Sequence, residues 1–172
     1  GVIECKKASV SIDQGIQQML RNQFKNYIPQ LFKFSQLLMA TNKNETKYAT
    51  CATPKEFWAV WKEQDQTWLQ EQLDGIVANR LPTIQDRNII SLFHPERLLE
   101  LTRFFMIYDK DVKKIARYQQ YFAIKEIIKV IGRTDKKGNR QSGVIWHTQG
   151  SGKSLTMVML AKYIFAELSD CF

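Results

Sequence analysis

Apolar residues recur along the chain in two kinds of pattern, short runs and helical spacing, which together predict a mixed α/β protein. Residues 1–6, 37–41 and 48–52 are short apolar runs typical of strands, with a polar turn between the last two. Residues 12–27 instead carry apolar side chains at helical spacing, and the segment Ser11–Gln14 at their start resembles a capping box. The order strand, helix, strand, strand therefore predicts a small α/β unit.

Helical patterns dominate the next part of the chain. The segment Thr53–Glu56 combines a capping residue, a proline at the first helical position and a glutamate, and predicts a helix ahead of Trp61. Further helices are predicted over about residues 65–78, from His94 onward, and over about residues 115–131. We expect the first two of these three helices to be connecting segments that carry no catalytic residues.

The strongest local motif is the segment His147–Ser154. It follows the apolar run Gly143–Trp146 and precedes an apolar stretch from Leu155 to Phe165. The order predicts a strand, a glycine-rich turn and a helix, which is the layout of a phosphate-binding loop. The usual pattern opens with a glycine where this chain has His147. The alternative is a chance Gly/Ser turn.

Each residue of such a loop has a physical role. Gly150 and Gly152 let successive backbone N–H groups curl around phosphate oxygens at the N-terminus of a helix. Lys153 reaches the β and γ phosphates, and Ser154 ligates Mg²⁺. The loop therefore predicts a nucleoside triphosphate as ligand.

Composition adds a basic charge to this picture. The 172 residues contain 25 Lys plus Arg against 17 Asp plus Glu, a formal net charge of +8. Such an excess favours nucleic acid or another polyanion as a partner. Cys5, Cys51 and Cys171 show no CxxC spacing, which argues against a disulfide framework or a zinc site and fits a reducing cytoplasm. No segment predicts a membrane span or a signal peptide.

Both ends of the chain are abrupt. The chain begins inside a predicted strand without an initiator Met and ends about a turn after the helix that follows the phosphate loop. A phosphate loop needs further parallel strands beside it, one of which carries an acidic residue that holds the magnesium-bound water. We therefore expect a fragment, or an incompletely ordered chain, rather than a complete enzyme.

A second candidate site lies on the first predicted strand. Glu4 and Lys6 are two residues apart, so their side chains project to the same face, while Cys5 points the other way. A carboxylate beside an ammonium can hold Mg²⁺ and orient a water for attack on a phosphodiester. Gln18 follows twelve residues after Lys6, on the predicted helix. The alternative is a plain surface ion pair, since Glu45 and Lys47 show the same spacing.

A third candidate is Gln120, about thirty residues before the phosphate loop. A glutamine amide offers both a donor and an acceptor, which matches the Hoogsteen edge of adenine. The alternative is an ordinary amphipathic helix with Arg117 and Gln120 in solvent.

Four segments together resemble the restriction (motor) subunit of type I restriction-modification enzymes, and the likeness covers nearly the whole chain. They are Ile3–Lys6, Gln18–Arg21, Ala116–Ala123 and Trp146–Ser154. In that family a histidine replaces the first glycine of the phosphate loop, as His147 does here.

The resemblance implies roles for the first site. Glu4 would be a metal ligand and Lys6 the catalytic lysine of a PD-(D/E)xK nuclease, and Gln18 would be the glutamine of the family's QxxxY motif. Asn22 stands where that motif has its tyrosine. The family's metal-binding aspartate lies upstream of the Glu-x-Lys strand and has no counterpart in this chain.

The resemblance also implies an ATP-driven motor. Gln120 would be the adenine-reading glutamine of superfamily 2 helicases, and the first helicase motif would bind ATP and Mg²⁺ through Gly150, Ser151, Gly152, Lys153 and Ser154. The magnesium-binding acidic box, the arginine finger and the second RecA-like domain have no counterpart in the chain. We therefore expect the isolated chain to be inactive in both chemistries.

The fold implied is α/β in three parts. Residues 1–64 would be part of a restriction-endonuclease-like domain, residues 65–112 a helical connector, and residues 113–172 the start of a RecA-like parallel-sheet P-loop domain. A family member pulls double-stranded DNA past a complex held by the specificity and methyltransferase subunits. It cleaves unmodified DNA far from the recognition site, in a bacterial or archaeal cytoplasm and with no membrane partner.

Two other interpretations stay open from the residues alone. One is a different P-loop NTPase, such as a kinase or a chaperone-like ATPase, with an unrelated N-terminal domain. The other is a noncatalytic scaffold that contacts DNA or partner subunits through its basic surface.

Overall fold

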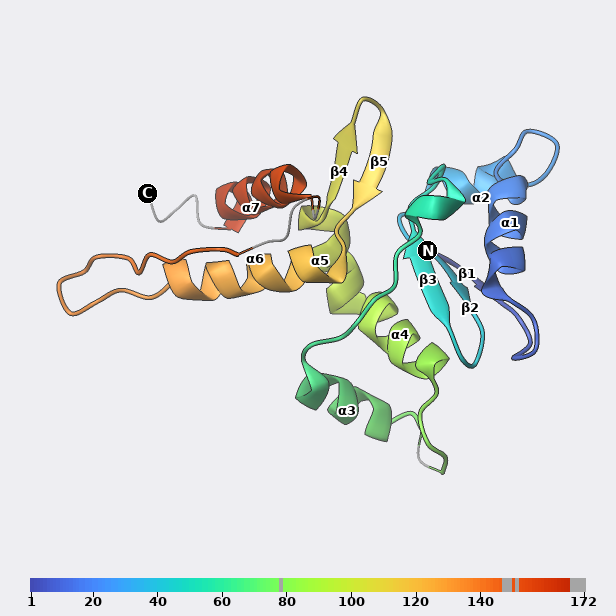
Figure 1. Ribbon diagram of the computed structural model, residues 1–172, viewed down its shortest axis with the longest axis horizontal. Coiled ribbons are helices and arrows are strands. Elements are labelled where there is room, and N and C mark those ends of the chain that lie inside the picture. The colour runs from blue at the N-terminus through green and yellow to red at the C-terminus, as the bar shows by residue number, and fades with distance from the viewer. Residues whose placement is uncertain (78, 147–149, 151, 168–172) are drawn as a thin grey trace.

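The computed structural model describes residues 1–77, 79–146, 150 and 152–167, and its fold is mixed α/β, as the sequence predicts. The first strands and helices form one end of the molecule, and the later helices and a hairpin form the other (Figure 1). The elements in chain order are β1 (Val2–Cys5), α1 (Ile12–Asn22), α2 (Pro29–Lys33), β2 (Leu38–Thr41), β3 (Thr46–Ala49), the short 3₁₀ helix η1 (Lys55–Phe57), α3 (Gln66–Asp74), α4 (Ile84–Phe93), α5 (Pro95–Phe104), β4 (Met106–Asp109), β5 (Val112–Ile115), α6 (Tyr118–Ile131) and α7 (Lys153–Glu167).

The first three strands form one sheet in the order β1-β2-β3. Strand β1 pairs with β2 in parallel, and β2 pairs with β3 in antiparallel. Helix α1 covers one face of this sheet, where Ile16 and Met19 pack against Leu38 and Ala40 in a buried cluster. The sequence predicted this order of strand, helix and two adjacent strands, and the structure confirms it.

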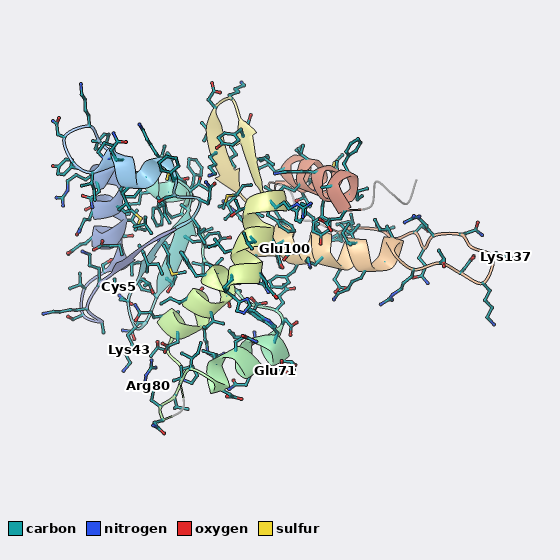
Figure 2. The ribbon with its side chains drawn as sticks, turned by 180° about the vertical axis from the view of Figure 1, so that it is seen from behind. Cys5, Lys43, Glu71, Arg80, Glu100 and Lys137 are labelled. Carbon is teal, nitrogen blue, oxygen red and sulfur yellow. The ribbon has the colours of Figure 1, made fainter. Side chains whose placement is uncertain are left out.

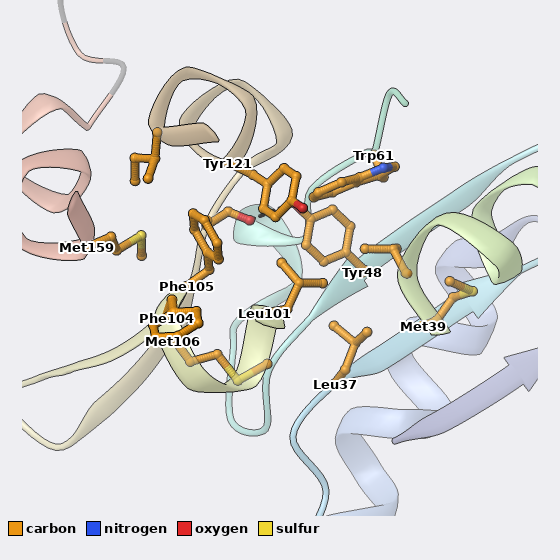
Figure 3. Packing of buried hydrophobic residues seen from close by; sticks show 13 residues of the cluster. Leu37, Met39, Tyr48, Trp61, Leu101, Phe104, Phe105, Met106, Tyr121 and Met159 are labelled. Atoms are coloured by element: carbon orange, nitrogen blue, oxygen red, sulfur yellow. Dashed lines mark hydrogen bonds between the residues drawn. The ribbon is translucent and has the colours of Figure 1, made fainter. Parts of the chain in front are cut away.

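The other face of the sheet is buried as well. Alternate side chains of a strand point to opposite faces, so Leu37 and Met39 face away from α1 and join a second cluster. Figure 3 shows this cluster, in which Tyr48 and Leu101 lie between the sheet and the aromatic rings of the second half. Its members come from all three predicted ranges, 1–64, 65–112 and 113–172, and the boundaries between these ranges stay a prediction.

The prediction of a helix from Thr53 onward is wrong beyond the first turn. Only η1 forms, and the chain then runs extended so that Ala59 exchanges two backbone hydrogen bonds with Tyr48, at N···O distances of 2.8 and 2.9 Å. The extended path sends Trp58 into the cluster under α1 and Trp61 into the second cluster. Burial of two indole rings on opposite sides outweighs the helical start signal.

Two predicted helices have shifted limits. Helix α1 ends at Asn22, whereas the apolar spacing extended it to Tyr27, and Pro29 begins the separate helix α2. Helix α6 begins at Tyr118, because Ile115 belongs to strand β5 and Arg117 is the N-terminal cap. Local periodicity does not reveal such ends, since the cap and the pairing partner decide them.

Helix α4 and the two strands of the β4–β5 hairpin were not predicted. Helix α4 begins with a capping box between Thr83 and Asp86, a signal that the sequence did contain. The β4–β5 hairpin turns at Lys110 and Asp111, both with positive φ, where such turns usually carry Asn-Gly. The hairpin therefore lacks the usual sequence signature.

The strand expected at Gly143–Trp146 does not form. These residues have no regular secondary structure, and Val144 and Trp146 are 94% and 91% exposed. A strand needs a hydrogen-bonded neighbour, and the strands of the described residues form only the β1-β2-β3 sheet and the β4–β5 hairpin. The preceding loop extends away from the body, with Lys137 at its tip (Figure 2).

Two side-chain hydrogen bonds join strand β3 and the residues after it to the second half of the chain. The Tyr48 hydroxyl donates to the Ala116 carbonyl at 2.8 Å, and the Thr50 hydroxyl donates to the Lys113 carbonyl at 2.7 Å. Burial raises the pKa of the Tyr48 hydroxyl, so it remains protonated and able to donate. The sheet thus holds the residues that lead into α6.

An ion pair between Arg97 and Glu63, both nearly buried, makes a further connection. Their closest nitrogen and oxygen are 2.9 Å apart. The Arg97 guanidinium also lies over the rings of Trp61 and Tyr121, at 5.6 and 4.7 Å from their centroids. Such cation–π contacts stabilise a charge that has lost water. Helix α5 is therefore tied both to the extended segment and to α6.

We expect Tyr48→Phe to lower the free energy of unfolding by about 1–3 kcal/mol, because it removes a buried hydrogen bond and keeps the ring. Urea unfolding followed by circular dichroism would measure this. Tyr108→Phe is the matched control, since Tyr108 is exposed on the hairpin and should change stability by under about 0.5 kcal/mol. Equal stability of the two variants would contradict the structural role of the Tyr48 hydroxyl.

Candidate functional site

The structure brings together Glu4, Lys6 and Gln18, the three residues to which the family resemblance assigns the nuclease site, and their catalytic roles stay a prediction. The Lys6 ammonium donates to Glu4 Oε1 at 2.8 Å and to Gln18 Oε1 at 2.7 Å. Strand β1 positions Glu4, Lys6 follows the strand directly, and α1 supplies Gln18. All three side chains are therefore held in one cluster between a strand and the helix that covers it.

Gly15 allows α1 to lie directly against this cluster. A Cβ atom at that position would lie 3.3 Å from Glu4 Cγ, 3.5 Å from Lys6 Cγ and 3.6 Å from the Ala40 side chain. The first distance is closer than ordinary contact, so only a residue without a side chain fits without displacement. The sequence analysis assigned no role to Gly15, although its position three residues before Gln18 on the predicted helix was a signal that it lies near the same cluster.

The chemistry available to this cluster follows from its groups. The Glu4 carboxylate can ligate a divalent cation, and the Lys6 ammonium can stabilise negative charge on a nearby oxygen. Within the described part of the chain, no three His, Cys, Asp or Glu side chains gather to hold a metal ion. Glu4 can therefore offer one ligand of a metal site.

Asn22, at the position of the expected motif tyrosine, ends helix α1. Its backbone carbonyl accepts a hydrogen bond from the Ile28 N–H at 3.1 Å, which closes the loop that follows. The guanidinium of Arg21, in the last turn of α1, lies 5.4 Å from the centroid of the Tyr27 ring in this loop.

The second site surrounds the phosphate loop, of which the structure describes Gly150 and Gly152–Ser154. His147–Gln149 and Ser151 lie outside the described residues. Gly150 and Gly152 have φ values of +76° and +83°, a backbone conformation that favours glycine. Helix α7 begins at Lys153, so Lys153 and Ser154 occupy its first turn. A turn of this kind fits the binding of phosphate by a helix N-terminus.

Gln120 lies against this loop rather than in solvent. It is buried, its Nε2 donates to the Gly152 carbonyl at 3.1 Å, and its Oε1 accepts from the Arg117 N–H at 2.9 Å. A Cβ on residue 152 would come within 2.6 Å of Gln120 Nε2. The amide therefore links the start of α6 to the loop.

A cavity of about 530 Å³ opens beside these groups. Volumes of about 300–1,000 Å³ are typical of small-molecule sites. Gln120, Gly150 and Gly152 line one side of it. Its lining also includes residues of β5 and around η1, namely Val112, Lys113, Lys114, Ile115, Ala52, Thr53, Pro54 and Phe57.

The sequence carries no signal for this part of the lining, because these residues are far from the phosphate loop along the chain. Among these residues, Lys113 is partly buried. Its ammonium donates to Gln36 Oε1, and burial lowers its pKa. The cavity is thus bounded by cationic and apolar groups from separate parts of the chain.

Comparison with known proteins divides the chain in the same way as the two sites. Residues 1–57, which include the first cluster, match the family model described as the type I restriction enzyme R protein N terminus. Residues 119–171, which include Gln120 and the phosphate loop, match the SWI2/SNF2 ATPase model.

Individual relatives agree with both matches. The HindI type I restriction enzyme endonuclease subunit of Haemophilus influenzae is 32% identical over 161 residues, or 85% of this chain. Two putative endonuclease subunits of Methanocaldococcus jannaschii, MjaVIIP and MjaIXP, are 30% and 33% identical over 94% and 78% of this chain. The chain belongs to the family of type I restriction enzyme R proteins. It spans 14 to 15% of the length of these relatives.

In this R protein family member, the described residues include no helix that is both long and apolar enough to cross a membrane.

We expect Gly15→Val to destabilise the chain by about 1–3 kcal/mol, since the added methyl groups overpack the contact between α1 and β1. The matched control is Gly75→Val, where an added Cβ meets nothing closer than 3.8 Å. Thermal unfolding compares the two. Equal loss of stability would show that α1 does not need the close approach at residue 15.

Proposed function

We propose that this chain contributes a metal-dependent nuclease site and part of an ATP-driven motor to a type I restriction endonuclease subunit. The observation that carries the proposal is the Lys6 ammonium, which joins Glu4 and Gln18 within the segment that matches the R protein N terminus. That match also argues against an unrelated N-terminal domain.

At the nuclease site, Glu4 would hold a divalent metal, for which we propose Mg²⁺. The metal, when bound, would polarise a phosphodiester and lower the pKa of a water molecule. Lys6 would hold its positive charge beside the scissile phosphate, and Gln18 would orient the Lys6 ammonium by accepting one of its protons in a hydrogen bond. Asn22, in place of the motif tyrosine, would leave DNA positioning to other side chains.

At the motor site, ATP would bind beside the phosphate loop. We propose that its phosphates contact the backbone of Gly150–Gly152 and the Lys153 ammonium, and that Ser154 ligates Mg²⁺. The base would enter the adjoining cavity, where the buried Gln120 amide is available to read adenine after it leaves one of its present partners. The cavity and the positive φ values of the two glycines support this assignment.

The wider organisation follows from the family. We propose that residues 1–64 belong to a nuclease domain, residues 65–112 to a connector, and residues 113–172 to the first RecA-like domain. The whole subunit would move along double-stranded DNA, associate with specificity and methyltransferase subunits, and cleave unmodified DNA away from the recognition site.

We expect the chain to bind ATP weakly and Lys153→Ala to abolish that binding, because the proposed contact of the Lys153 ammonium with the β and γ phosphates is lost. Fluorescence of a labelled ATP analogue would measure it. Lys129→Ala, an exposed substitution on α6, serves as the control and should bind as the original chain does. Unchanged binding in Lys153→Ala would remove the assigned role of the loop.

In a complete R subunit with this sequence, we expect Glu4→Gln and Lys6→Ala each to reduce DNA cleavage by at least about 100-fold, because the first weakens the proposed metal site and the second removes positive charge beside the reacting phosphate. ATP hydrolysis should continue in both variants. Lys7→Ala is the neighbouring exposed control. Retained cleavage in Glu4→Gln would rule out the proposed metal site.

A further inference from the structure

A long stretch of the first predicted domain carries no acidic residue. Residues 14–44, between Asp13 and Glu45, contain no Asp or Glu. They do contain Arg21, Lys25 and Lys33, and a fourth basic residue, Lys43, lies in the turn between β2 and β3. The stretch includes the C-terminal half of α1, all of α2 and the loop between them. The positive charge on the surface of this stretch therefore attracts anions, because no acidic residue within the stretch neutralises that charge.

The same stretch exposes large aromatic rings. Phe24, Tyr27 and Phe34 are 67%, 51% and 85% exposed. All three rings lie within residues 24–34, and large exposed apolar surface on a folded protein usually marks a contact surface. We call this the aromatic–basic surface and define it by Arg21, Phe24, Lys25, Tyr27, Lys33 and Phe34.

The backbone beneath the aromatic–basic surface is ordered by its own hydrogen bonds. The Phe24 N–H donates to the Arg21 carbonyl, and the Tyr27 N–H donates to the Phe24 carbonyl, both at 3.0 Å. The side chain of Phe32 on α2 is buried in the cluster that α1 forms with the sheet, which holds α2 in place. The rings are consequently presented on a folded segment, so little conformational entropy is lost when a partner binds.

The chemistry of the surface selects its partner. Interleaved aromatic rings and basic side chains bind single-stranded nucleic acid, because unstacked bases lie on the rings while phosphates meet the cations. A closed duplex keeps its bases stacked on one another and offers no faces to Phe24 or Phe34. We propose that the aromatic–basic surface binds single-stranded DNA, such as a strand opened or frayed near the cleavage site.

The location of the surface agrees with this role, and the inference rests on the proposed nuclease function. Arg21 is on the same helix as Gln18, about 4.5 Å further along its axis. A strand held on the aromatic–basic surface would therefore leave it close to Glu4 and Lys6. The surface would help to position DNA at the site where Asn22 replaces the motif tyrosine.

The test is fluorescence anisotropy of the 172-residue chain with fluorescein-labelled oligo(dT), compared with the same strand annealed to oligo(dA). We expect tighter binding to the single strand. The double variant Phe24→Ala/Phe34→Ala should lower that affinity at least about fivefold, the loss typical of one stacked base. Tyr108→Ala/Phe165→Ala, which removes two exposed rings elsewhere, should bind as the original chain does.

The charge component has its own measurement. Lys25→Ala/Lys33→Ala should reduce the slope of log affinity against log salt by about 0.7 for each DNA phosphate that the variant no longer neutralises. Lys136→Ala/Lys137→Ala, at the tip of the loop after α6, is the matched control and should keep the slope. Circular dichroism spectra of all variants should coincide, because every substituted side chain is exposed.

Three results would overturn the proposal: unchanged oligo(dT) affinity in Phe24→Ala/Phe34→Ala, an equal loss in its control, or tighter binding of the duplex. If Phe24→Ala/Phe34→Ala differs from the original chain in molar mass by light scattering but not in DNA affinity, the surface would instead be assigned to a protein contact. The proposed nuclease function fails separately, through retained cleavage by Glu4→Gln in the complete subunit, whatever the oligo(dT) affinity.

Discussion

The arrangement of both sites depends on the burial of the central sheet on both of its faces. Leu38 and Ala40 of β2 lie under α1, while Leu37 and Met39 enter the cluster shared with α5, α6 and α7. A strand with two apolar faces must be covered on both. Because one cover carries Gln18 and the other leads to Gln120, the same strand supports the nuclease candidate and the nucleotide candidate.

Polar contacts then make this shared packing specific. The Tyr48 hydroxyl meets the Ala116 carbonyl just before the cap of α6, and the pair of Arg97 and Glu63 is nearly buried among aromatic rings. Buried groups of this kind are costly unless every partner is present. They therefore favour one relative placement of the sheet, the extended segment after it and α6.

Local signals in the sequence predicted a large part of this structure. The Glu4–Lys6 spacing and the capped helix that follows place Gln18 beside them, and the glycines of the phosphate loop adopt the backbone that their residue type allows. The signals failed where a distant partner decides the outcome. The extended path at Trp58 and Trp61 needs the edge of β3 and two separate cores, and neither is visible in residues 53–61 alone.

The sequence by itself determined which chemical groups are available at each candidate site, because carboxylate, ammonium, amide and glycine-rich loop are properties of residues and short spacings. It determined also that residues 14–44 carry no acid. Only the tertiary structure decided the close approach at Gly15, the cavity wall formed by residues around η1 and β5, and the exposure of Phe24 and Phe34. These features depend on contacts between segments far apart in the chain, whose energies no local pattern contains.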